Sequence, residues 1–182
     1  MKPRTLFAVL ALHLLGALPA AAQGGGGPSA LVVTTDNRTA AAEAARGAPR
    51  RDAGVRPGDV LRYRLTFTNV AGRPVRSVAL SNPLPEQFRF VPGSTRASRE
   101  DARAEYSADG GRSFSLQPME EVVVDGRRVQ RPVAPERYTH VRWIVGGWVA
   151  PGATVTAEFE ARLPAPARGT GAAEPAAGRG GR

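Results

Sequence analysis

The segment Val60–Thr68 alternates strictly between apolar and polar residues. Its apolar positions are Leu61, Tyr63, Leu65 and Phe67. Successive side chains of a β-strand point to opposite faces of a sheet, so a period of two predicts a strand with one buried face. His140–Val145 and Thr154–Leu163 show the same alternation. We therefore expect three half-buried strands of this kind.

Shorter segments between turn residues predict further strands. They are Ala30–Thr35, Val75–Leu80, Phe88–Val91, Ala104–Ser107, Ser113–Leu116, Glu121–Val124 and Arg127–Gln130. Pro57-Gly58, Asp125-Gly126 and Pro151-Gly152 mark turns, because proline sets φ and glycine accepts positive φ. The segment Asn82–Pro85 is expected to end a strand, because proline cannot donate to a strand ladder.

One segment, Ala40–Arg51, is rich in alanine and could be a helix by propensity. Gly47 and Pro49 interrupt it and it has no apolar stripe, so we expect a loop or a single turn. The succession of short strands without a convincing helix predicts an all-β fold, an antiparallel β-sandwich over residues 30–164.

The first 22 residues have the pattern of an export signal. Lys2 and Arg4 precede an apolar run from Leu6 to Leu18, and an Ala-Ala-Ala sequence ends at Ala22. This is typical of a signal peptide, and the apolar run is too short to span a bilayer. We expect cleavage after Ala22, a glycine-rich linker at 23–29, a disordered tail at 165–182, and no membrane span in the mature chain.

Charge and composition narrow the possible partners and chemistries. The chain has 25 Lys+Arg against 16 Asp+Glu, a net charge of +9, no cysteine, and Lys2 as its only lysine. The arginines are spread along the chain rather than massed on one run, so we do not expect nucleic-acid binding. Acidic glycans or envelope proteins remain as partners. Without cysteine, disulfides and thiolate catalysis are excluded, and without a lysine after residue 22, so are Lys–Asn isopeptide bonds in the mature chain.

Five motifs occur in an order similar to that of a known bacterial family. They are PGDVLRYRLTFTN (57–69), SNPLPEQFRFVPGS (81–94), YSADGGRSF (106–114), YTHVRWIVGG (138–147) and VAPGATVTAEFEARL (149–163). Together they resemble, over residues 55–163, the bacterial cell-surface repeat domain called domain of unknown function eleven. The resemblance implies an immunoglobulin-like sandwich in an exported or envelope protein, present here as a single copy. It implies no catalytic residues.

The segment Ser107–Phe114 also resembles the Asp-box, a β-hairpin motif of sialidase-type propellers. The Asp109 carboxylate can accept backbone N–H bonds across the turn while glycines adopt positive φ. We expect a structural hairpin, because a propeller would need several copies. A calcium site at Asp109 is the alternative; otherwise no metal and no cofactor are expected.

The histidine His140 is the only one after residue 22, so a Ser/His/Asp triad would have to use it. Its position in the alternation turns it away from the core together with Arg142. It is either an ordinary surface histidine or the centre of a hydrolase. The acidic pairs Glu100-Asp101 and Glu120-Glu121 are adjacent on predicted strands or loops, so their spacing does not form an acid–base dyad.

Four residues are candidates for a ligand surface: Trp148, Arg62, Arg64 and Arg142. Alternation puts Tyr63 and Trp143 in the core, whereas Trp148 is the best candidate for an exposed aromatic. The outward residues Arg62 and Arg64 would form a basic strip with Arg142 if their strands pair; the alternative is a solvated face.

The prediction for function is an exported, non-enzymatic β-sandwich, periplasmic or extracellular, with a structural or binding role in the cell envelope. The alternatives are a glycan-binding module that uses the exposed aromatic and arginine residues, and a hydrolase centred on His140.

Overall fold

The computed structural model describes residues 30–51 and 54–166. The predicted signal peptide, the glycine-rich linker and nearly all of the predicted tail lie outside these residues.

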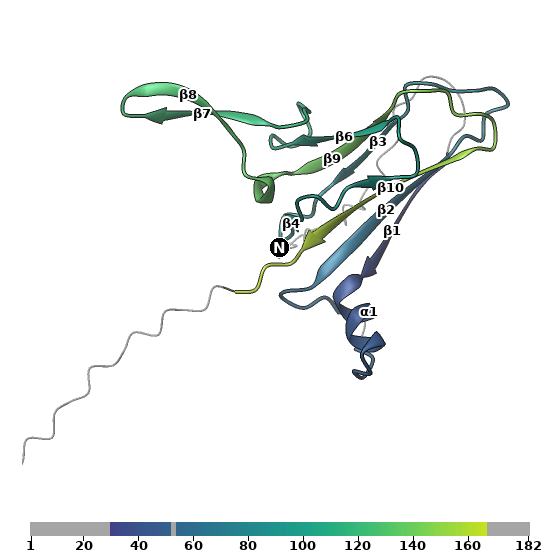
Figure 1. The fold of residues 1–182 in the computed structure, drawn as a ribbon, viewed down its shortest axis with the longest axis horizontal. Helices are drawn as coiled ribbons and strands as arrows, with labels where there is room; N and C mark the ends of the chain where they lie inside the picture. The colour runs from purple at the N-terminus through teal and green to yellow at the C-terminus, as the bar shows by residue number, and fades with distance from the viewer. Residues whose placement is uncertain (1–29, 52–53, 167–182) are drawn as a thin grey trace, which may run out of the picture.

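The larger sheet contains five antiparallel strands (Figure 1). Its order is β1 (Ala30–Asn37), β2 (Val60–Thr68), β10 (Thr154–Arg162) and β4 (Arg89–Phe90), and β5 (Arg96–Ala97) also pairs with β10. The two long strands are in register from Thr68 opposite Thr154 to Val60 opposite Arg162. The two strands with the clearest alternation therefore lie side by side.

The second sheet has the order β3 (Ala79–Pro83), β9 (His140–Val145) and β6 (Ala102–Ser107). A separate hairpin, β7 (Met119–Val124) and β8 (Arg127–Pro132), projects from the body in Figure 1 and is followed by the short 3-10 helix η1 (Pro135–Arg137). All the pairings are antiparallel. The predicted all-β class is confirmed.

One hydrophobic core joins the two sheets. Alternate residues of β2, β10 and β9 are buried, as their patterns predicted. Trp143 of one sheet lies 6.1 Å, ring centre to ring centre, from Phe159 of the other. Phe159 also stacks on Tyr63 at 5.0 Å. Each such apolar side chain contributes roughly 1.5–3 kcal/mol by burial, so the interleaved faces are the main source of stability.

A helix forms where a loop or a single turn was predicted. Helix α1 spans Arg38–Ala45, directly after β1. The side chain of Asn37 accepts a hydrogen bond from the amide of Ala40 and so caps the first turn. None of the helix residues is buried, as expected from the missing apolar stripe. The prediction failed because it weighed the interruptions at Gly47 and Pro49 and overlooked the cap before them.

The strand end predicted at Asn82–Pro85 is confirmed, because β3 ends at Pro83, opposite His140. Proline is tolerated at this position because β3 is an edge strand of the described sheet. Two predicted boundaries differ. Val75 makes only an isolated bridge to Val149, and Ser115 only one to Tyr106. The strand predicted at Val75–Leu80 therefore begins later, and the one at Ser113–Leu116 is reduced to a single bridge.

Within residues 30–51 and 54–166, no helix has the length and apolar character needed to cross a membrane.

Replacing Trp143 by alanine is expected to lower the free energy of unfolding by about 3–5 kcal/mol, because the side chain is fully buried between the sheets. Trp148, which is 60% exposed, provides a matched control, and its alanine variant should lose less than about 1 kcal/mol. Urea unfolding followed by far-ultraviolet dichroism measures both. Equal losses in the two variants would contradict this assignment of the core.

Candidate functional site

The Asp-box segment folds into a loop organised by one carboxylate. Asp109 accepts hydrogen bonds from the Ser113 hydroxyl at 2.6 Å, from the Ser113 amide at 3.0 Å and from the Arg112 amide at 3.0 Å. The buried Ser107 hydroxyl donates to Asp109 at 2.7 Å and accepts from the amide of Gly111 at 2.9 Å. These bonds, first those from Ser113, hold the pKa of Asp109 well below its usual range.

This loop covers His140. A Cβ atom added at Gly111 would lie 3.1 Å from Nε2 of His140, and Phe114 meets the imidazole edge-on with 6.3 Å between ring centres. The ring lies away from the core, as the alternation predicted, but the loop leaves it only partly exposed. Burial lowers the pKa of His140, although the nearby charge of Asp109 opposes the shift. His140 is therefore a surface histidine that the Asp109 loop partly covers.

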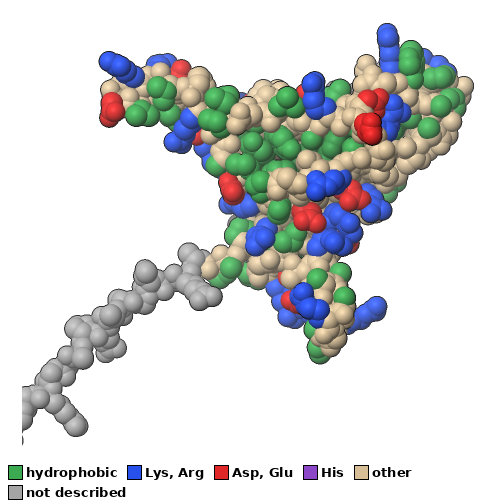
Figure 2. Space-filling model, viewed as in Figure 1, with side chains coloured by type: hydrophobic (Ala, Val, Ile, Leu, Met, Phe, Trp, Pro, Cys, Tyr) green, Lys and Arg blue, Asp and Glu red, His purple; other side chains and the backbone are tan. Residues whose placement is uncertain are grey.

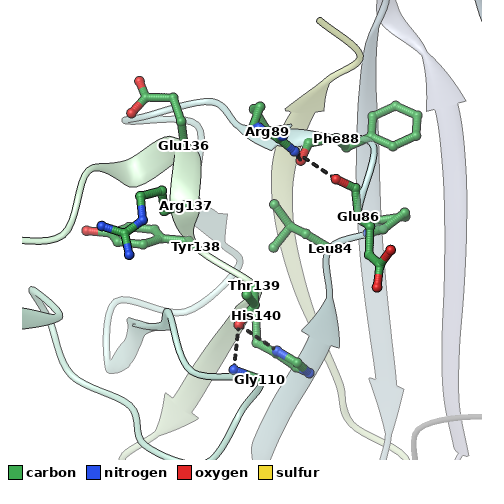
Figure 3. Close-up of a pocket in the computed structure, with 11 residues that line it drawn as sticks. Leu84, Glu86, Phe88, Arg89, Gly110, Glu136, Arg137, Tyr138, Thr139 and His140 are labelled. Atoms are coloured by element: carbon green, nitrogen blue, oxygen red, sulfur yellow. Dashed lines mark hydrogen bonds between the residues drawn. The ribbon is translucent and has the colours of Figure 1, made fainter. Parts of the chain in front are cut away.

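A hollow of about 530 Å³ lies beside His140, between η1 and the segment 84–89, and Gly110 of the loop also lines it (Figure 3). Thr139 stands at its base, and its hydroxyl accepts from the Gly110 amide at 3.1 Å and lies 3.2 Å from Nδ1 of His140. Figure 3 shows Glu86 and Arg89 on the opposite wall, where Arg89 donates to the backbone carbonyl of Glu86 at 2.7 Å.

The described residues around this hollow do not assemble a catalytic triad. A general base is oriented by a third group, most often a carboxylate. Within the described residues, the imidazole has one side-chain hydrogen-bond partner, the neighbouring Thr139 hydroxyl. The nearby Ser107 hydroxyl is committed to Asp109. The described ranges also contain no group of three or more metal-binding side chains, and the carboxylate oxygens of Asp109 already accept hydrogen bonds from its own loop.

The predicted basic strip does not form. Arg62 and Arg64 lie on β2 of the larger sheet, whereas Arg142 lies on β9 of the other, so their strands do not pair. All three are neutralised locally. Arg62 pairs with Asp36 at 3.1 Å, Arg64 with Glu158 at 2.6 Å and Arg142 with Glu105 at 2.6 Å. Figure 2 likewise shows acidic and basic side chains interspersed on the face in view.

The exposure predicted for Trp148 is confirmed. Its indole forms one wall of a second hollow, of about 580 Å³, together with Arg73, Pro74 and Ala150. The guanidinium carbon of Arg76 lies 5.4 Å from the centre of the indole ring, a cation–π distance. These two arginines were not among the predicted site residues, because their approach to Trp148 depends on the bridge between Val75 and Val149, which local alternation does not reveal.

The backbone that presents Trp148 is held on both sides. Arg99 donates to the Trp148 carbonyl at 3.0 Å, and Asp101 accepts from the Gly147 amide at 2.8 Å. A Cβ atom at Gly147 would come within 2.6 Å of the Asp101 carboxylate and 2.8 Å of the Arg99 guanidinium, so a larger residue there would require both side chains to move. On the other side Val149 is fully buried. A fixed backbone therefore carries an exposed aromatic ring.

No protein-family model matches the chain, and no curated protein is significantly similar to it. The resemblance to the bacterial surface repeat domain stays a prediction.

The Asp109→Asn variant is expected to lose stability relative to the wild type at neutral pH, and the difference should shrink in acid. Because the folded-state pKa of Asp109 is lowered, its contribution is fully present above the unfolded-state pKa of roughly 4 and is lost as the pH falls below that value. Thermal unfolding of both proteins between neutral pH and strong acid measures the effect. A difference that stays constant over this range would contradict the role of the charge.

Proposed function

We propose that the chain is an exported, non-enzymatic module with an immunoglobulin-like β-sandwich, which binds a partner or serves as a structural unit in the cell envelope or outside the cell. The observation that carries the proposal is a contrast between the titratable side chains and an exposed aromatic one. Asp109, His140 and Glu105 are engaged in local contacts, whereas the Trp148 ring is held out to solvent. A surface of this kind is suited to binding rather than to proton transfer.

Two features of the sequence support an extracytoplasmic site. Residues 1–22 have the basic, apolar and small-residue regions of an export signal. The five motifs that resemble the surface repeat domain agree with this location.

Export is tested by expressing the full chain with a C-terminal tag in a bacterial host, fractionating the cells and sequencing the N-terminus of the product. We expect the protein in the periplasm or medium, beginning at Gln23. A Leu10→Arg variant, which interrupts the apolar run, should remain in the cytoplasm with its leader intact. Finding the wild-type precursor uncleaved in the cytosol would contradict the proposal.

A second candidate function, glycan binding, is favoured by the hollow at Trp148. Sugar rings stack on exposed indoles, and Arg76 brings positive charge to the same place. Asp101, the nearby acid, is already paired with Arg99 at 2.6 Å. The chemistry of the hollow therefore suits a carboxylated sugar chain.

Titration with polygalacturonate at low ionic strength should shift the tryptophan emission, and added salt should weaken the effect because the attraction is screened. Trp143 is buried, so the signal should come from Trp148 and vanish in the Trp148→Ala variant. Neutral dextran is the control ligand. An unchanged emission spectrum, or the same shift in the variant, would rule out this second function.

A further inference from the structure

The β7–β8 hairpin is a two-stranded ribbon that stands apart from both larger sheets (Figure 1). Its tip is a two-residue turn at Asp125 and Gly126, both with positive φ, of the kind that joins tightly twisted strands. Within the described chain neither strand is paired with a third. Both outer edges of the hairpin therefore present backbone groups that another strand could pair with.

Apolar side chains are concentrated on this ribbon. Val123 is 68% exposed, and Met119, Val124 and Val129 are exposed as well. A lone two-stranded hairpin is marginally stable in water, and three or more strands are usually needed. Ion pairs of Glu120 with Arg131 and Arg137 secure the base, and one further pair, Glu121 with Arg128 at 3.0 Å, crosses the hairpin nearer its tip. The distal half of the hairpin would gain from a further strand.

We propose that β7 pairs with β7 of a second copy of this chain, antiparallel and about a two-fold axis at Val122. The result is a continuous four-stranded sheet in the order β8, β7, β7 and β8. The charges along the edge of β7 identify the partner as a second copy, because an axis at Val122 places no acidic side chain opposite another.

The backbone permits this register. Val124 and Arg127 face each other across the turn, so in an antiparallel hairpin Val124, Val122 and Glu120 bond inward to β8. The alternating residues Glu121 and Val123 direct their amides and carbonyls outward. With the axis at Val122, Glu121 of each copy lies opposite Val123 of the other, and the two pairs exchange four hydrogen bonds.

Among two-fold axes in the middle of β7, from Glu120 to Val123, the charges favour one. An axis at Glu120 or Glu121 would place that carboxylate opposite its own copy, and an axis at Val123 would place Glu121 opposite Asp125. Like charges directly opposite each other destabilise a sheet. With the axis at Val122, no acid faces an acid, and Val129 and Val122 of both copies form one row of four valines, since these two residues are already paired within the hairpin.

The β8 edge is unsuited to the same pairing. It would bring Arg127, Arg128 and Arg131 of both copies to one seam. Pro132, at the end of the strand, has no amide to donate. The hairpin therefore has one edge that accepts a second copy and one that discourages it.

A single cysteine tests the register directly, because the natural chain contains none. At Val122 the two copies would form a non-hydrogen-bonded pair with a Cα separation of about 4.5 Å, within the range of a disulfide. In the full chain, Val122→Cys should oxidise to a covalent dimer, whereas Glu121→Cys and Val123→Cys, whose copies are offset, should react much more slowly. Equal rates at the three positions would overturn the proposal.

Charge changes at Val123 test the pairing without a covalent bond. In a Val123→Glu dimer, the two-fold axis creates two pairs of Glu opposite Glu121, so the dimer dissociation constant should rise roughly tenfold. Val123→Arg places Arg opposite Glu121 in both pairs and should lower the constant by a similar factor. Within one hairpin Val123 lies opposite Arg128. If the variants acted only on hairpin stability, Val123→Glu would therefore strengthen dimerisation and Val123→Arg would weaken it. Sedimentation equilibrium of the full chain measures the association.

Three results would overturn the proposal. The first is a full chain that stays monomeric up to millimolar concentration. The second is tighter dimerisation in Val123→Glu than in Val123→Arg, as expected if the variants act through Arg128 of their own hairpin. The third is a dimer lost in Val32→Glu and kept in Val123→Glu, which would place the contact on the exposed edge strand β1 instead. Retention of the native dichroism spectrum shows that each variant is folded.

Discussion

The contact between the inner faces of β9 and β10 is the interaction on which the rest of the structure depends. Trp143 and Phe159 meet there, and Tyr63 stacks on Phe159 from the neighbouring strand. Because the chain has no cysteine, this apolar layer has no disulfide to assist it. The faces must therefore alternate without error, since a slip of one residue would turn every buried side chain to solvent.

A second, polar device closes the end of this layer. The buried carboxylate of Asp59 accepts hydrogen bonds from Asn37 at 2.7 Å, from Arg51 at 2.9 Å and from the amide of Arg56 at 2.9 Å. Burial alone would raise the pKa of Asp59, but these three partners lower it. One carboxylate thereby ties the helix cap, the following loop and the start of β2 together.

Local patterns predicted the long strands well and the irregular parts poorly. The alternation in Val60–Thr68 and Thr154–Leu163 reports burial on one face, and both strands formed with that face inward. Helix α1 was missed because its stability depends on a cap from Asn37, a residue that ends the preceding strand. The arginine strip was misjudged because outward residues on different strands share a surface only if their strands pair.

By itself the sequence determined which residues could be buried, which turns were possible and which chemistries lack a reagent, because these depend on residue type and on spacing of a few positions. Tertiary structure alone decided that the Asp109 loop covers His140, that Arg76 stacks on Trp148, and that β7 and β8 stand apart from the body. Each of these joins or separates segments that lie far apart along the chain, and their positions follow from strand order and packing, which no local pattern records.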